Sequence, residues 1–230
     1  MAHDIILSIK KSITYLPRLG INATKLASHL TTAALAKPLV LASTSRYRAE
    51  LLNRLQITFT TVSPDCDEAP LVGESCANTA MRLAAAKARA GAIRAGLVAG
   101  IVIGSDQVAD LDGTAIGKPG TRENAVKQLR LMCGKRVIFH TALAVLDIES
   151  GRLQLAIVPT MVTMRKYNEQ AIIHYLDREN ALDCAGSAKS EGLGAALIAS
   201  MTSDDPSALV GLPLLSLITM LAAEGIEVLG

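Results

Sequence analysis

The stretch Ile101-Val-Ile-Gly-Ser-Asp-Gln-Val108, followed shortly by Gly117-Lys-Pro119, carries most of the information about the fold. The apolar run Ile101–Ile103 ends in small residues and delivers one carboxylate, Asp106. This pattern predicts a buried strand whose end presents polar groups, which is where α/β proteins bind ligands. Lys118 adds an ammonium group after a short connection. A carboxylate and a lysine placed in this way suit an anionic substrate and a metal ion.

Strand and helix patterns alternate along the chain on both sides of this stretch. Apolar or alternating runs predict strands, amphipathic or Ala-rich runs predict helices, and no internal repeat is present. An Asp-Gly pair at 112–113 marks a hairpin. Interleaved helices and strands favour an α/β fold with a mixed sheet. The predicted strands are 39–41, 57–62, 101–103, 108–111, 115–116, 137–148 and 153–164, and the predicted helices are 46–55, 74–94, 121–132, 168–178 and 212–223.

Composition and charge limit the classes of protein to which the chain can belong. It has 230 residues, half of them hydrophobic and 19% charged, so it can bury a full core as one domain or two lobes. The net charge of +2 is uneven, because residues 1–37 hold five basic residues and one acidic residue, which leaves 18 basic and 20 acidic residues in the remainder. A mildly acidic body is a poor electrostatic match for nucleic acid, so no nucleic-acid partner is expected.

The basic segment 1–37 is expected to be a poorly ordered N-terminal extension, with the folded domain spanning 38–230. An acid-poor start that bears Ser and Thr is also typical of an organellar transit peptide, and a start codon assigned too far upstream would give the same composition. The longest apolar stretch, 209–223, contains a Gly and a Pro and is too short to cross a membrane. We therefore expect no membrane partner and a cytoplasmic location.

The four cysteines and four histidines show no spacing typical of a metal site or a disulfide framework. No two cysteines have CxxC spacing, and no histidine stands close enough to complete a zinc set. Free thiols in a reducing compartment are therefore expected. Two glycine motifs also fail, because 113–119 has Pro where a P-loop needs Ser or Thr and 192–194 lacks the third glycine of a dinucleotide site.

The segment Ser43-Thr-Ser-Arg-Tyr-Arg48 lies between a predicted strand and the start of a predicted helix. Free N–H groups and the positive dipole end at a helix N-terminus bind phosphate. Ser43 and Ser45 add hydroxyl donors, and Arg48 can hold a phosphate through two parallel hydrogen bonds. An ordinary capped helix with solvated arginines explains the same residues, so this segment alone does not decide between the two hypotheses.

The acidic loop 63–73 and the helix after it contain further candidates. Asp65, Asp67 and Glu68 suit Mg²⁺, which takes oxygen ligands and keeps several waters, but a solvated acidic turn is the commoner explanation of such a cluster. Lys87 stands among small residues on the predicted helix, either at the surface or reaching into a groove.

In this order, these segments resemble the Maf family of nucleoside triphosphate pyrophosphatases. The resemblance runs from about residue 38 to the C-terminus, and ordered blocks together are far more specific than any single one. It implies an elongated α/β fold with two lobes around a deep cleft, similar to the inosine triphosphate pyrophosphatases. The matching blocks are Leu41-Ala-Ser-Thr-Ser45 with Arg48, Asp67-Glu68, Arg82-Leu83 with Lys87, Gly104-Ser-Asp106, Gly117-Lys-Pro119, Cys184-Ala-Gly-Ser187 through Lys189-Ser-Glu-Gly192, and Leu209-Val-Gly-Leu-Pro213.

The resemblance implies hydrolysis of a nucleoside triphosphate between the α and β phosphates, giving the monophosphate and pyrophosphate. It gives Asp106 the role of the proton acceptor that activates water, and Glu68 that of a ligand to a divalent cation, Mg²⁺ or Mn²⁺. A carboxylate base, a metal ion and cationic side chains supply the deprotonation and charge neutralisation that dominate phosphoryl chemistry. The implied phosphate-binding set is Ser43, Ser45, Arg48, Lys87 and Lys118.

Three positions separate a branch of this family that acts on dTTP and UTP from one that acts on 7-methyl-GTP. They fall on Tyr47, Gln107 and Glu191, which match the aromatic, Gln and Glu of the 7-methyl-GTP branch rather than the Arg, Thr and Gln of the other. An aromatic face attracts the cationic methylated base, Glu191 can accept from guanine N–H groups, and Gln107 can offer a paired donor and acceptor. Tyr47 stands in place of the usual Trp, Arg46 in place of Pro, and Ala188 in place of a bulky aromatic.

The resemblance therefore predicts a 7-methyl-GTP pyrophosphatase with a small-molecule nucleotide as its substrate. A dTTP/UTP or broad-specificity pyrophosphatase is the first alternative. A non-enzymatic regulator, for instance of cell division, is the second, and the retained carboxylates and lysines argue against it. The oligomeric state stays open, with a homodimer among the possibilities.

Overall fold

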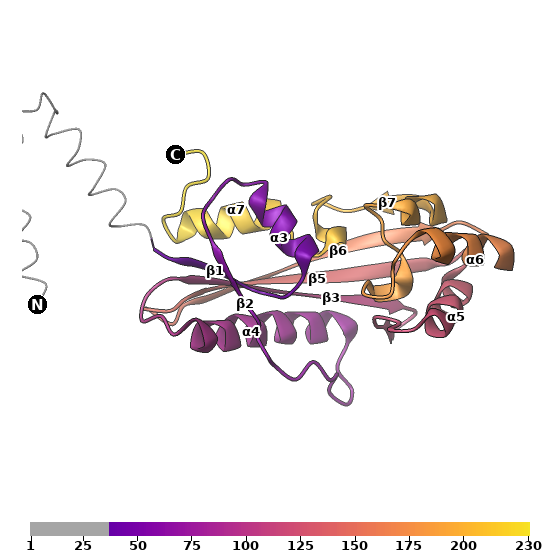
Figure 1. Cartoon of the computed structure of the whole chain (residues 1–230). Coiled ribbons are helices and arrows are strands. Elements are labelled where there is room, and N and C mark those ends of the chain that lie inside the picture. The colour runs from indigo at the N-terminus through magenta and orange to yellow at the C-terminus, as the bar shows by residue number, and fades with distance from the viewer. Residues whose placement is uncertain (1–36) are drawn as a thin grey trace, which may run out of the picture. The chain divides into compact units, whose positions relative to one another are not determined.

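The computed structural model describes residues 37–230, so the expectations for the N-terminal extension concern residues outside that range, apart from Lys37. A mixed sheet of seven strands runs through this part, in the order β2-β1-β3-β5-β6-β7, with β4 paired to β3 (Figure 1). β2, β1 and β3 are parallel and all other pairs are antiparallel. The strands are β1 (Leu39–Ala42), β2 (Thr60–Val62), β3 (Ile101–Leu111), β4 (Thr114–Ile116), β5 (Arg136–Asp147), β6 (Leu153–Met164) and β7 (Ile198–Thr202).

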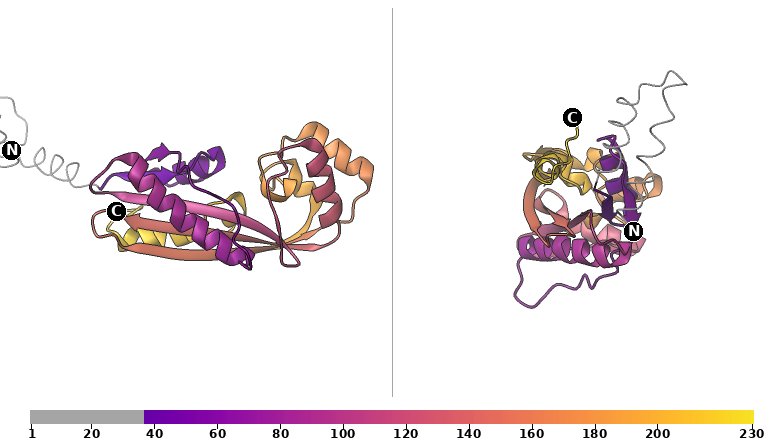
Figure 2. Two further views of the ribbon diagram at one scale, coloured as in Figure 1. Left: turned by 90° about the horizontal axis from the view of Figure 1, so that it is seen from below. Right: turned by 90° about the vertical axis from the view of Figure 1, so that its left-hand side faces the viewer.

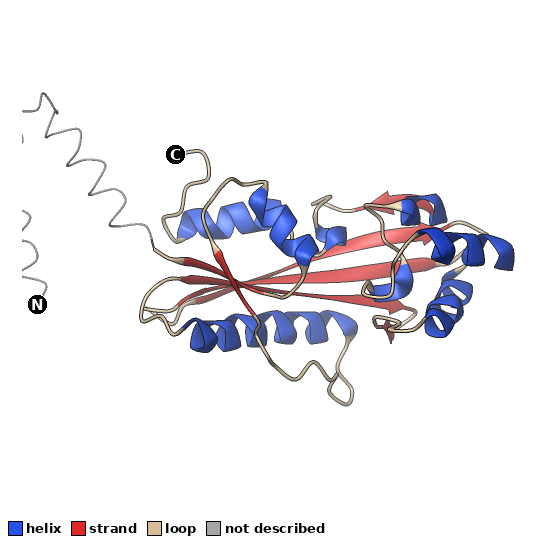
Figure 3. Cartoon of the chain, in the orientation of Figure 1, coloured by secondary structure: helices blue, strands red, loops and turns tan. Residues whose placement is uncertain are grey.

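Five α-helices and three short 3-10 helices accompany the sheet in the described part of the chain (Figure 3). The predicted mixed α/β fold is thereby confirmed. Across residues 37–230, no helix is both long and apolar enough to cross a membrane. The α-helices are α3 (Arg46–Asn53), α4 (Cys76–Ala95), α5 (Arg122–Met132), α6 (Glu169–Arg178) and α7 (Leu214–Ala223), and the 3-10 helices are η2 (Ala185–Ser187), η3 (Leu193–Leu197) and η4 (Ala208–Val210).

The two faces of the sheet are buried by different helices. Leu39 and Leu41 of β1 belong to the apolar cluster that contains α3 and α7 residues, whereas Val40 and Ala42 belong to the cluster formed with α4. This is the alternation that a strand imposes, since successive side chains point to opposite faces. Figure 1 accordingly shows α4 along one face and α3 and α7 along the other, and Figure 2 shows α5 and α6 farther along the long strands.

The predicted caps of α3 and α5 and the predicted hairpin are confirmed, whereas α4 and α7 begin two residues later than predicted, at Cys76 and Leu214. The Ser45 and Thr121 side chains accept from the backbone N–H groups of Arg48 and Asn124, at 3.4 and 3.3 Å, and so cap α3 and α5. Asp112 and Gly113 both have positive φ, as a two-residue hairpin turn requires. All four cysteines, which lie within the described residues, are free.

The prediction that a strand ends near Gly104 is wrong. β3 continues without a break from Ile101 to Leu111, so Asp106 lies in mid-strand and not at a strand end. Gly104 packs closely against α4, where an added Cβ would lie 2.3 Å from the Ala84 carbonyl oxygen. Pairing with β5 holds the polar part of the strand extended as far as Asp110.

Two other elements differ from the predictions. β2 begins at Thr60 rather than at residue 57, and 57–59 precede it without regular structure. β7 was not predicted, because four of its five residues are exposed and no buried alternation marks it in the sequence. Pairing with β6 creates this edge strand.

Candidate functional site

The residues singled out from the sequence lie in one cavity of about 900 Å³. They come from the loop before α3 and the first turn of α3, from the loop between β2 and α4, from α4, from mid-β3, and from segments after β4 and before η3. A volume of this size fits a nucleotide-sized ligand. The cavity is lined by all ten predicted site residues, namely Ser43, Ser45, Tyr47, Arg48, Glu68, Lys87, Asp106, Gln107, Lys118 and Glu191.

A gap in the sheet opens β3 to this cavity. β1 pairs with β3 only as far as Ala42 opposite Gly104, and β4 begins to pair at Ala109 on β3. Residues 105–108 therefore have no β1 or β4 partner, although β5 still pairs with them on the other side. Asp106 and Gln107 lie in this gap, so their side chains can reach the cavity while β5 still holds their backbone.

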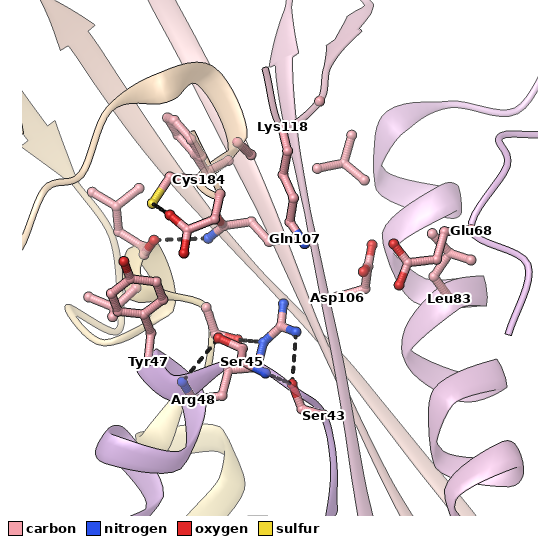
Figure 4. Close-up of a pocket in the computed structure, with 18 of the residues that line it drawn as sticks. Ser43, Ser45, Tyr47, Arg48, Glu68, Leu83, Asp106, Gln107, Lys118 and Cys184 are labelled. Atoms are coloured by element: carbon pink, nitrogen blue, oxygen red, sulfur yellow. Dashed lines mark hydrogen bonds between the residues drawn. The ribbon is translucent and has the colours of Figure 1, made fainter. Parts of the chain in front are cut away.

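Lys87 joins the two carboxylates at one end of the cavity. Its Nζ lies 2.7 Å from Asp106 Oδ1 and 2.7 Å from Glu68 Oε1. Lys87 and Asp106 are only 5% and 6% exposed, so Lys87 reaches into the groove and is not a surface lysine. Figure 4 shows Asp106 and Glu68 facing each other, with Lys118 extending toward them. Within residues 37–230, Asp106 Oδ2 has no hydrogen-bond partner and is left to a ligand or a water.

Electrostatics at this end depend on burial and on the lysines. Burial by itself would raise the pKa of Glu68, but the hydrogen bond and charge of Lys87, with smaller effects from Lys118 and Arg48, lower it below its usual value. Burial lowers the pKa of Arg48, opposed by the charges of Asp106 and Glu68. Two carboxylates, Asp106 and Glu68, therefore lie near three cationic side chains at this end of the cavity. Such an arrangement suits a polyanion.

The hydroxyl groups of the two serines before α3 accept hydrogen bonds from the protein and do not donate any to described residues. Ser43 Oγ accepts from Ser45 N at 3.1 Å and from Arg48 Nη1 at 3.4 Å, which uses both of its lone pairs. Arg48 Nε donates to the Gly211 carbonyl at 2.8 Å, so its guanidinium is held in place. Since Ser43 Oγ only accepts from described residues, its hydroxyl proton is available to a ligand oxygen or a water.

The acidic loop contributes one carboxylate to the cavity, not three. Asp65 pairs with Arg94 at 3.6 Å, and Asp67 accepts from Ala69 N at 2.9 Å, so neither joins Glu68. No set of three potential ligands converges within residues 37–230. Mg²⁺ or Mn²⁺ is commonly held by one or two carboxylates together with substrate phosphates and waters, and Glu68 and Asp106 fit that arrangement.

Tyr47 marks the other end of the cavity. Arg46 lies over its ring, 4.7 Å from the centroid, and donates to its hydroxyl at 2.7 Å. Lys189 Nζ is 5.7 Å from the same centroid and is also bound to Glu179 at 2.8 Å. Cys184 lies beside Tyr47 in Figure 4, and burial raises the pKa of its thiol to about 12, so the thiol stays protonated.

Gln107 does not offer the paired donor and acceptor that the sequence suggested. Its Nε2 donates to Thr141 Oγ1 at 2.8 Å and to the carbonyls of Ala208 and Leu209 at 3.0 Å each. These contacts use both amide protons within the protein. Only the amide oxygen is left for a ligand, so the expectation of a free donor at this position is corrected.

Two parts of the site were missed by the sequence analysis. Asp183 lines the cavity next to Cys184 and adds negative charge near Tyr47. The Gly211 carbonyl accepts from both Ser105 and Arg48, which ties β3 and α3 to the segment before α7. The block Leu209–Pro213 belongs to the resemblance, so it was a signal for this segment, but its spacing does not reveal the contacts.

Comparison with known proteins settles the family. A family model described as "Maf-like protein" matches residues 38–224. The chain belongs to the Maf family. The match covers every element from β1 to α7, including all ten predicted site residues, as the sequence resemblance implied.

Three proteins similar to this Maf-family chain share a name. A protein named "7-methyl-GTP pyrophosphatase" from Methylobacillus flagellatus is 51% identical over 192 residues, which is 84% of this chain and 99% of that protein. Proteins of the same name from Chromobacterium violaceum and Aromatoleum aromaticum are each 54% identical, over 83% and 82% of this chain and 98% and 96% of their own lengths.

Proposed function

We propose that this Maf-family protein hydrolyses 7-methyl-GTP between the α and β phosphates, releasing 7-methyl-GMP and pyrophosphate. The observation that carries the proposal is the cluster in which the buried Lys87 bridges the buried Asp106 and the exposed Glu68, in the same cavity as Tyr47 and Glu191. The names of relatives that are more than half identical over most of the chain support the same substrate.

Asp106 is assigned the role of general base. Lys87 occupies its Oδ1, so Oδ2 is the atom that takes a proton from water. The water oxygen attacks the α phosphorus, the bond from that phosphorus to the bridging oxygen breaks, and pyrophosphate leaves with the electron pair. General-base action of this kind contributes roughly 10²–10⁴-fold to a rate.

The cationic groups and serines are assigned to the triphosphate. Lys87, Lys118 and Arg48 face the same region as the two carboxylates, since all three lower the pKa of Glu68. They would neutralise charge on the transferred and leaving phosphates, and the free hydroxyl proton of Ser43 and that of Ser45 would donate to phosphate oxygens. Glu68 would help to hold a divalent cation, which supplies charge stabilisation of the phosphate oxygens when bound.

The charges at the other end of the cavity suit a cationic base. Among the residues that line the cavity there, Asp183 and Glu191 are acidic and Arg46 is basic, which leaves an excess of negative charge. The ring of Tyr47 provides a face that attracts a cation, worth about 0.5–2 kcal/mol. N7-methylguanine is positively charged, whereas guanine, uracil and thymine are neutral.

One observation favours a broader pyrophosphatase as a second candidate. The Arg46 guanidinium lies over the ring of Tyr47, where it competes with a cationic base for the aromatic face. A neutral base such as that of dTTP or UTP would not be repelled by it.

A substrate panel separates the two candidates. Values of kcat/KM are measured for 7-methyl-GTP, GTP, dTTP and UTP with Mg²⁺ and with Mn²⁺, and the products are identified as monophosphate and pyrophosphate. The proposal expects 7-methyl-GTP to have the largest value. A preference for dTTP or UTP, or release of orthophosphate, would overturn it.

A further inference from the structure

Two backbone carbonyls of η4, those of Ala208 and Leu209, hold the side chain of Gln107 at the cavity. Ala208 O accepts from Gln107 Nε2 and from Thr141 Oγ1, and Leu209 O accepts from Gln107 Nε2. Thr141 is fully buried on β5, where it is the strand partner of Gln107. The Gln107 amide is therefore surrounded on one side by three oxygen atoms from two distant segments.

This surrounding fixes which end of the amide faces the cavity. Two of the three neighbours are carbonyl oxygens, which can only accept hydrogen bonds, so the amide nitrogen must be the atom that faces them. The Thr141 hydroxyl gives its own proton to Ala208 O and so acts toward Gln107 as an acceptor too. No hydrogen bond to Gln107 Oε1 comes from residues 37–230, although Gln107 lines the cavity.

We propose that Thr141 and the carbonyls of Ala208 and Leu209 fix Gln107 as a pure acceptor, so that the base end recognises the 2-amino group of guanine together with its N1–H. This deepens the proposed function and rests on it. Gln107 Oε1 and the Glu191 carboxylate are both acceptors, and the guanine edge offers two adjacent donors, N1–H and N2–H. Each acceptor then takes one donor.

Other bases do not present two adjacent donors to the two acceptors, Gln107 Oε1 and Glu191. Uracil and thymine have a single N3–H between two carbonyl oxygens, which would face Gln107 Oε1 or Glu191 across a repulsive contact. Hypoxanthine keeps N1–H but has no amino group, so one acceptor would be left without a partner. An unpaired acceptor of this kind costs about 1–3 kcal/mol, which corresponds to roughly 5- to 150-fold in kcat/KM.

The test compares 7-methyl-GTP with 7-methyl-ITP, which lacks only the 2-amino group, using the full-length wild-type protein. We expect kcat/KM to be at least about tenfold lower for 7-methyl-ITP. Values within about twofold of each other, with 7-methyl-GTP still preferred over dTTP and UTP, would overturn this inference and leave the proposed function standing. A preference for dTTP or UTP would instead overturn the proposed function.

Two variants of Thr141 test its positioning role. Thr141→Val keeps the shape but removes the acceptor, so the preference for 7-methyl-GTP over 7-methyl-ITP should fall about two- to fivefold, through KM rather than kcat. Thr141→Ser keeps the hydroxyl and should show the wild-type preference for 7-methyl-GTP over 7-methyl-ITP. Equal preference in wild type and Thr141→Val, or a loss in Thr141→Ser as large as in Thr141→Val, would contradict the positioning role.

Discussion

The two ends of the cavity are built differently. The phosphate end, which contains Ser43, Arg48, Glu68, Lys87 and Asp106, is carried mainly by β3, α4 and the start of α3, and Lys87 and Asp106 are buried. The base end combines Tyr47 of α3 and Gln107 of β3 with Asp183 and Glu191, which stand on segments without regular helix or strand, and Glu191 is exposed.

The difference separates the chemistry from the choice of substrate. Groups that act on the phosphates need fixed distances, and a strand paired on one side and packed against α4 supplies them. Groups that recognise the base can stand on loops, which tolerate substitution. Gln107 and Tyr47 are exceptions, because Gln107 stands on β3 and is held by carbonyls of η4, and Tyr47 stands in the first turn of α3. Substitutions at the two ends should therefore have different consequences.

The largest expected effect is at the phosphate end. Asp106→Asn should lower kcat about 10²–10⁴-fold for every nucleotide that is hydrolysed, because the amide cannot accept the proton from water. The measurement is steady-state kinetics with 7-methyl-GTP and with dTTP. Asp110→Asn is the matched control, since Asp110 is on the same strand but pairs with His140 outside the cavity. Undiminished turnover in Asp106→Asn would remove Asp106 as the base.

The protein should tolerate an added methyl group less well next to the phosphate end, at Gly104, than next to the base end, at Gly192. Gly104→Ala places Cβ 2.3 Å from the Ala84 carbonyl and 2.6 Å from Ala88 N, so α4 must shift, at about 3 kcal/mol of unfolding free energy. Gly192→Ala meets the Glu179 carboxylate at 2.4 Å, a side-chain end that can shift at the expense of its hydrogen bonds to Lys189 and Leu193 N without moving a helix, so the expected loss is about 1 kcal/mol. Urea denaturation compares the two, and equal losses would contradict a difference in rigidity.

Substitution of Tyr47 should change selectivity more than rate. Tyr47→Trp offers a larger aromatic face and should raise the ratio of kcat/KM for 7-methyl-GTP to that for GTP about two- to fivefold. Tyr47→Leu, which keeps apolar bulk without the ring, should lower the ratio. Arg46→Ala should also raise it by removing the competing cation from the ring. A ratio that does not respond to any of the three variants would exclude stacking on Tyr47.

The smallest effect concerns the loop that carries Glu68. Hydrogen bonds from Arg82, more than those from Thr79 and Leu71 N, lower the pKa of Glu74 to about 2 and tie this loop to α4. Because the folded pKa is below the unfolded value, the stabilisation is complete above about pH 4.5 and is lost as the pH falls toward 2.

Glu74→Gln should therefore lower the urea midpoint at pH 7, and its difference from wild type should shrink below pH 4.5. Denaturation curves between pH 7 and pH 2.5 measure this difference. Arg82→Gln removes the same pair and should give the same pH dependence. A difference that is constant over the whole range would show that the pair is not its cause.

Helices and caps could be predicted from the sequence because their signals are local. Thr121 lies just before α5, and Gly96 ends α4 in the left-handed conformation, as expected from glycine after a helix. The continuity of β3 could not be predicted, because polar Ser105–Gln107 stay extended only through pairing with β5 and packing against α4. Tertiary contacts override the local pattern there.

The residues that line the cavity were predicted more completely than the contacts among them. All ten predicted residues line the cavity. The loss of the Gln107 donor could not be foreseen, because its partners Ala208 and Leu209 are 101 and 102 residues away. Every residue has a backbone carbonyl, so a sequence motif cannot indicate which carbonyl makes a contact. The same reason hides the role of Gly211, whose carbonyl orients Arg48.

The most direct test of the division between the two ends is the ratio of kcat/KM for 7-methyl-GTP to that for dTTP. It is measured in wild type and in a triple variant, Tyr47→Arg, Gln107→Thr and Glu191→Gln, which leaves the phosphate end unchanged. We predict a ratio above one in wild type and at least about a tenfold fall in the triple variant. A ratio that is the same in both proteins would contradict the assignment of substrate selection to the base end.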